Sequence, residues 1–118
     1  MATFNSTISG SNTGDTLIGT ENNQFINAGT GNDSIKTTYS SSSVLGNAGN
    51  DTIGAAGANA TVYGGSGSDS FYFVDGLTSV LLAGNHDNDT LQVFGGSTAS
   101  SVWGGSGQDS LKIAADAS

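Results

Sequence analysis

The chain lacks several residue types on which common folds and sites depend. It has no cysteine, no proline and no arginine. Without cysteine it can form neither a disulfide nor a thiolate metal site. Two lysines against ten acidic residues give a net charge of −8, so no basic patch is available to hold a nucleic acid. No apolar run exceeds four residues, whereas a membrane-spanning helix needs roughly 18.

Large apolar residues are also scarce. Leu, Ile, Val and Phe make up 24 of the 118 residues, which is close to the level of disordered chains. Gly, Ser, Thr and Asn supply 61 residues, and these are poor helix formers, so a helical bundle is excluded. The length suits a single small domain. Composition alone leaves two options: a disordered chain, or a fold that needs neither helices nor a wide core.

An internal repeat decides between these options. An Asp followed by Ser or Thr and then by a large apolar residue recurs with spacings of 18, 18, 18, 20 and 20 residues, at Asp15, Asp33, Asp51, Asp69, Asp89 and Asp109. A small residue stands five positions before each Asp, namely Gly10, Ala28, Gly46, Gly64, Gly84 and Gly104. Two positions earlier stands an apolar residue: Ile8, Ile26, Val44, Val62, Leu82 or Val102. Disorder would not keep these columns in phase, so the chain folds.

The period predicts an all-β parallel β-roll, or β-solenoid, of about six coils that spans residues 1–118 as one domain. It is too short for helix-turn-helix repeats and suits two short strands and two turns per coil. We expect the Ile8 column to face inward from one sheet. The second inward column is Leu17, Ile35, Ile53, Phe71, Leu91 and Leu111, with Phe73, Val93 and Ile113 as further inward candidates. Phe94 and Trp103 are expected to lie in the core or to widen the longer C-terminal coils.

The turn between the two columns resembles a known calcium-binding motif. Residues 64–69 read GGSGSD and residues 104–109 read GGSGQD. Both resemble the nonapeptide G-G-x-G-x-D-x-U-x of the RTX family, in which U is a large apolar residue. The other turns keep the Asp but replace glycines with Ala, Asn or Asp, and the first turn, residues 10–15, departs furthest.

The resemblance implies that Ca²⁺ lies between consecutive turns, bound by their aspartates and by turn carbonyls. The implied ligands are the six repeat aspartates, the small residues five positions before them, and the third residue of each turn: Asn12, Thr30, Ala48, Ser66, His86 and Ser106. Six turns define five gaps, so we expect about five ions, and a sixth at a joint between chains. Calcium prefers oxygen ligands, and glycine lets carbonyls turn inward. The alternative is that these are ordinary Asp turn residues.

The other turns lack the motif, so calcium is expected on one edge only. Nothing in the sequence points to catalysis: His86 is the only histidine, so no catalytic triad or zinc site can be assembled. Glu21 has no second carboxylate for acid–base chemistry. We therefore expect neither enzymatic activity nor a small-molecule substrate. A carbohydrate platform around Trp103 and an ice-binding Ser/Thr face were weaker alternatives.

Two function classes follow. The first is an extracellular structural protein, secreted to a bacterial cell surface, that assembles head to tail with copies of itself into a filament or surface layer. The repeat columns run close to both termini and leave no charged cap, which favours this class. We expect the strand around Ile113 to pair with the strand around Ile8 of the next chain. The second is an RTX-type folding module cut from a larger secreted toxin, protease, adhesin or surface-layer protein.

Overall fold

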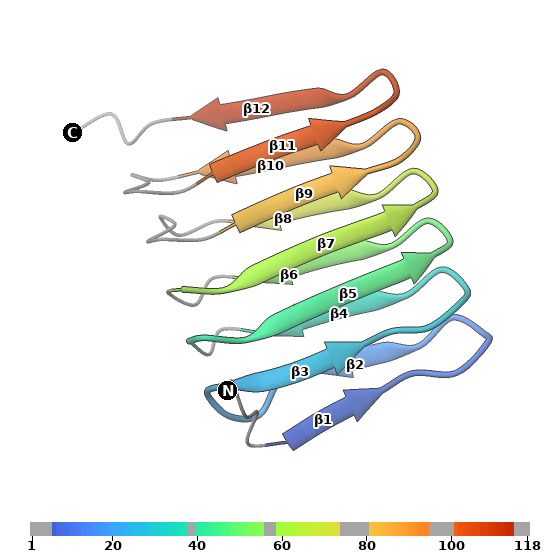
Figure 1. Cartoon of the computed structure of the whole chain (residues 1–118), viewed down its shortest axis with the longest axis vertical. Helices are drawn as coiled ribbons and strands as arrows, with labels where there is room; N and C mark the ends of the chain where they lie inside the picture. The colour runs from blue at the N-terminus through green and yellow to red at the C-terminus, as the bar shows by residue number, and fades with distance from the viewer. Residues whose placement is uncertain (1–5, 38–39, 56–58, 74–80, 95–100, 115–118) are drawn as a thin grey trace.

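A computed structural model describes residues 6–37, 40–55, 59–73, 81–94 and 101–114 (Figure 1). These residues form strands and no helix. The strands are β1 (Ser6–Ser9), β2 (Thr16–Ile18), β3 (Gln24–Asn27), β4 (Ser34–Thr37), β5 (Ser43–Ala48), β6 (Thr52–Ala55), β7 (Thr61–Ser66), β8 (Ser70–Phe73), β9 (Leu81–Asn85), β10 (Thr90–Phe94), β11 (Ser101–Gly105) and β12 (Ser110–Ala114). The predicted all-β solenoid is confirmed.

Each coil contributes one strand to each of two parallel sheets. The odd sheet has the order β1-β3-β5-β7-β9-β11, and the even sheet has the order β2-β4-β6-β8-β10-β12. Equal spacing places each residue beside its counterpart one coil away: Ile8 pairs with Ile26 in the odd sheet, and Leu17 with Ile35 in the even sheet. The coils therefore stack in register along the axis of the molecule (Figure 1).

The core is a thin apolar layer between the sheets, built from the two predicted inward columns. Its fully buried side chains are Ile26, Ile35, Val44, Ile53, Val62, Phe71, Leu82 and Leu91. Side chains alternate between the faces of a strand, so one apolar residue per strand suffices to fill this layer. Burial declines toward the ends: Ile8 and Val102 are partly buried, and Leu111 is 47% exposed. Among the described residues, the apolar side chains of the end coils are thus less covered than those of the interior coils.

The expectation for Trp103 is wrong. Trp103 is 59% exposed on the outer face of the odd sheet, because its strand neighbour Val102 occupies the inward position. Tyr72 is likewise 52% exposed, next to the buried Phe71. The remaining expectations for aromatic and inward residues concern Phe73, Val93, Phe94 and Ile113, whose side chains lie outside the described part of the structure.

None of the described residues belongs to a helix long and apolar enough to cross a membrane.

Candidate metal centre

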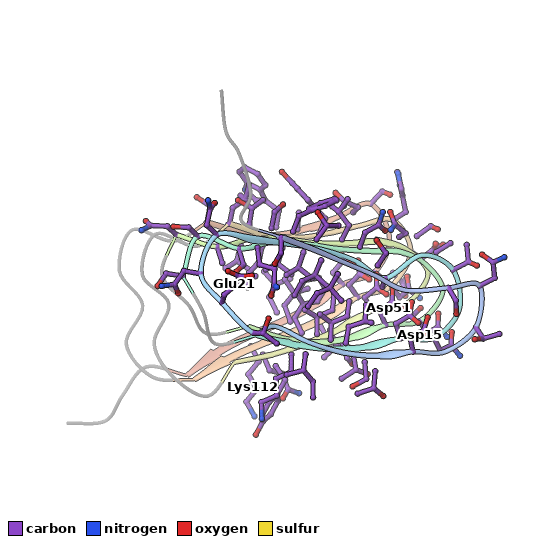
Figure 2. The ribbon with its side chains drawn as sticks, turned by 90° about the horizontal axis from the view of Figure 1, so that it is seen from below. Asp15, Glu21, Asp51 and Lys112 are labelled. Atoms are coloured by element: carbon purple, nitrogen blue, oxygen red, sulfur yellow. The ribbon has the colours of Figure 1, made fainter. Side chains whose placement is uncertain are left out.

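The six repeat aspartates lie on one edge of the solenoid, where each odd strand turns into the following even strand. Each Asp ends its turn directly before an even strand, as Asp15 does before β2. Figure 2 shows Asp15 and Asp51 at this edge and Glu21 toward the opposite one. The structure therefore brings all six aspartates into one column, as the repeat predicted.

Consecutive aspartates are joined by hydrogen bonds. The backbone N–H of each Asp donates to Oδ1 of the Asp in the next coil, at 2.8 or 2.9 Å, which links Asp15, Asp33, Asp51, Asp69, Asp89 and Asp109 in a chain of five bonds. The backbone carbonyl of each Asp except the last accepts at 2.8 Å from the residue after the next Asp, as Ser34 donates to Asp15. We call this column the aspartate ladder. One carboxylate oxygen in each pair therefore has a structural role.

The second carboxylate oxygen has no such role in the interior coils. Four ladder residues are only 1–2% exposed, namely Asp33, Asp51, Asp69 and Asp89. None of the described residues donates a hydrogen bond to their Oδ2 atoms. The first coil differs, because Asp15 Oδ2 accepts from the N–H of Ser11 at 2.6 Å and from its hydroxyl at 2.9 Å. A buried carboxylate oxygen without a donor is costly, so this position calls for a proton or a cation.

The glycine column provides the space for these oxygen atoms. A Cβ on Gly64 would lie 2.3 Å from Oδ2 of Asp69 and 3.0 Å from the carbonyl oxygen of Gly84. The same arrangement recurs at Gly46, where the two oxygens would lie 2.5 and 2.6 Å from the Cβ. A carboxylate oxygen and the carbonyl oxygen of the next coil thus meet beside a glycine Cα.

Ala28 is the exception in this column and is fully buried. Apart from it, the small-residue column lets carboxylate and carbonyl oxygen atoms approach the backbone closely. Such a donor set suits a hard cation such as Ca²⁺, which takes about six to eight oxygens.

Burial raises the pKa values of the central ladder residues. The pKa of Asp69 rises to about 7 and that of Asp51 to about 6, in each case mainly because burial disfavours the charged carboxylate. The hydrogen bond from the backbone N–H of the preceding Asp lowers each pKa, but by less than burial raises it. The negative charge of neighbouring aspartates adds to the increase. The pKa of Asp89 is raised for the same reasons. In the absence of a cation, Asp51 and Asp69 therefore bind protons at a higher pH than an ordinary aspartate does.

The third residues of the turns serve mainly to join one turn to the next. The carbonyls of Ala48 and Ser66 accept from Gly31 and Gly49 of the preceding coil, at 3.0 and 3.1 Å. Thr30 donates to Asn12 Oδ1 at 3.3 Å, and His86 Nδ1 lies 3.2 Å from the Ser106 hydroxyl, both on the exposed surface. A carbonyl has a second lone pair, so these groups can still serve as ligands.

No three carboxylate or imidazole side chains come together around one point among the residues that the structure describes. A cation at this edge would therefore draw most of its ligands from carbonyls and only one or two from carboxylates. The Oδ2 atoms and the carbonyls of the glycine column meet this requirement. The residues present fit Ca²⁺.

Sequence reasoning missed a second ladder. Oδ1 of Asn32 accepts from the backbone N–H of Asn50 at 2.8 Å, and Oδ1 of Asn50 accepts from Ser68 at 2.9 Å. Asn88 accepts from Gln108 in the same way. These Asn side chains accept hydrogen bonds from the following coil, whereas the side chains of the aspartate ladder accept them from the preceding coil. Asn-Asp pairs at 32–33, 50–51 and 88–89 were the available signal.

The opposite edge of the first coils carries a polar cluster around Gln24, which is 1% exposed. Gln24 Nε2 donates to the Ser6 hydroxyl at 2.8 Å, and Gln24 Oε1 accepts from the Thr20 N–H at 2.9 Å. The Ser6 hydroxyl donates to Glu21 at 2.6 Å. Glu21 is thus tied into a local network. The turns expected to lack the motif span residues 20–23, 38–41, 56–59, 75–78 and 95–98. The structure describes the first of them and only residues 40, 41 and 59 of the others.

Comparison with known proteins adds no relative. No family model matches the chain, and neither the curated proteins nor the solved structures gave a significant match.

Proposed function

We propose that this protein is an extracellular structural β-solenoid that binds calcium along the aspartate ladder and assembles end to end. The observation that carries the calcium part is the row of four buried Oδ2 atoms without a hydrogen-bond partner among the described residues. Ordinary turn aspartates are exposed, or their free oxygen accepts from a nearby backbone N–H group, as Oδ2 of Asp15 does from Ser11. The repetition of this unmet oxygen in four successive coils supports a repeated ligand.

In this proposal, Ca²⁺ is held by the Oδ2 atoms of the ladder and by the carbonyls of the small-residue column in the adjacent coil. When bound, the ion supplies the positive charge that the buried carboxylates lack. Because the apolar layer is thin, metal binding would provide a large part of the folding free energy. Such coupling suits a protein that folds after export, where calcium is abundant.

The proposal is tested by comparing thermal unfolding with calcium and with a chelator. In Asp69→Asn, the side-chain oxygen can still accept the Asp51 N–H, and the buried position no longer carries a charge. We expect this variant to be more stable than the wild type in chelator and to show a smaller stabilisation by calcium. Glu21→Gln is the matched control, because it also removes one negative charge but lies toward the opposite edge, where the new side-chain oxygen can still accept from the Ser6 hydroxyl. An unchanged calcium response in Asp69→Asn would contradict calcium binding at the ladder.

The assembly part of the proposal rests on the open sheet edges at both ends of the described solenoid (Figure 1). Unpaired strand edges and half-covered apolar residues such as Leu111 favour pairing with another chain. Particle size in millimolar calcium separates the two function classes. Rods would support the assembling structural protein, and monomers at high concentration would favour the RTX-type folding module.

A further inference from the structure

The two ends of the aspartate ladder carry complementary open groups. The described residues give no acceptor for the backbone N–H of Asp109 and no donor for Oδ1 of Asp15. In the interior, these same two groups are partners in every ladder bond, as the N–H of Asp51 donates to Oδ1 of Asp69. The C-terminal end of the ladder therefore presents the donor of one further ladder hydrogen bond, and the N-terminal end presents the acceptor.

The backbone repeats this complementarity in both sheets. In the even sheet, the residue after each later ladder Asp donates to the carbonyl of the Asp one coil before it. Among the described residues, the Thr16 N–H and the Asp109 carbonyl are therefore without partners at opposite ends. In the odd sheet, the Gly10 N–H donates to the Asn27 carbonyl one coil further on. By the same pattern, the Gly104 N–H and the Ser9 carbonyl are open at opposite ends.

We propose that a second copy of this chain continues the aspartate ladder, with Oδ1 of its Asp15 accepting a hydrogen bond from the Asp109 N–H of the first copy. This inference rests on the proposed self-assembly and specifies its joint. β11 then pairs with β1 of the second copy, and β12 pairs with β2. The expected pairing of the Ile113 strand with the Ile8 strand does not follow the topology, because these strands belong to different sheets.

The open groups also select the orientation of the joint. Two C-terminal ends would place one Asp109 N–H against another, which leaves both donors without an acceptor. Two N-terminal ends would place one Asp15 carboxylate against another, and these charges repel. Only a head-to-tail contact joins a donor to an acceptor and keeps both sheets parallel. It also lets Leu17 of the second copy cover Leu111, which is 47% exposed.

The greater length of the later coils does not obstruct this contact. From the inward apolar residue to the ladder Asp, all coils have the same length, as Ile8 to Asp15 and Val102 to Asp109 show. The two extra residues of the longer coils fall between the ladder Asp and the next apolar column, toward the opposite edge. Trp103 points outward and needs no cover within the joint.

Two proline variants can block one end each. The Thr16 N–H faces the open N-terminal end, because its counterpart Ser34 donates to the preceding coil. Ser110 donates to Asp89, so the peptide groups of Leu111 and Ile113 face the open C-terminal end by alternation. Thr16→Pro and Ile113→Pro each remove one donor from an open edge. Thr16→Val and Ile113→Val keep the N–H groups and are the matched controls.

Particle mass is measured by light scattering in millimolar calcium, after circular dichroism has confirmed that each variant retains its β-structure. We expect rods for the wild type and both valine controls, monomers for each proline variant alone, and one-to-one dimers when the two proline variants are mixed. Dimers of a single proline variant would overturn the head-to-tail orientation. Rods of wild-type length from both proline variants would overturn this joint but not self-assembly. A monomeric wild type would overturn self-assembly and this joint together.

Discussion

At the scale of single residues, backbone conformation limits which side chains the turns accept. Gly65 has a φ of 105° and lies in register between Asn47 and Asn85, whose φ values are 77° and 86°. Asparagine adopts this region far more readily than β-branched residues do. Any Cβ at this position would meet the Asn47 carbonyl oxygen at 2.1 Å, so both substitutions should destabilise the fold. We expect Gly65→Val to cost about 1–3 kcal/mol or more and Gly65→Asn to cost clearly less. Urea unfolding of both variants measures the difference, and equal losses would contradict this explanation.

Individual residues also show what the sequence could and could not predict. The spacing of the aspartates and of the apolar columns predicted the fold and placed the ladder on one edge, because in a solenoid equal spacing means vertical alignment. It could not predict that Oδ1 of Asp51 accepts the Asp33 N–H while Oδ2 stays without a partner, since this depends on the turn geometry. Trp103 was misplaced because a large apolar residue next to Val102 does not itself indicate which of the two faces inward.

At the scale of the ladder, metal-free stability should depend on pH in a defined direction. Burial raises the pKa of Asp51 to about 6 and that of Asp69 to about 7 in the folded chain, against roughly 3.9 when unfolded. Between about pH 4 and pH 7 the folded chain then binds more protons than the unfolded chain, so its free energy of unfolding falls as the pH rises. We expect Tm in chelator to decrease across this window and saturating calcium to reduce that decrease. A Tm that rises with pH in chelator would contradict the raised pKa values.

The cluster at the opposite edge allows a prediction that does not involve metal. Gln24 is buried and makes hydrogen bonds to Ser6 and Thr20. Gln24→Ala removes these hydrogen bonds and empties a buried position, so we expect a loss of about 1–3 kcal/mol in the free energy of unfolding, with an unchanged calcium response. Gln92→Ala, at a partly exposed position in β10, is the control and should cost far less. Similar losses in the two variants would show that the cluster does not stabilise this edge.

At the scale of the whole molecule, a thin apolar core is combined with a ladder of acids whose mutual repulsion a cation would relieve. A net charge of −8 in a rod with one apolar residue inward per strand leaves little to oppose repulsion among the aspartates. Calcium would remove that repulsion along the whole edge at once, so folding, metal binding and end-to-end growth should respond together.

The most direct test is a calorimetric titration of the purified protein with calcium, followed in parallel by circular dichroism. The account predicts binding of about five ions per chain, one for each gap between consecutive turns, together with a large gain in thermal stability. Magnesium at the same concentration should have a much weaker effect, because it demands a smaller and more regular set of ligands. A chain that keeps its β-structure and thermal stability in chelator and takes up no calcium would contradict the central claim.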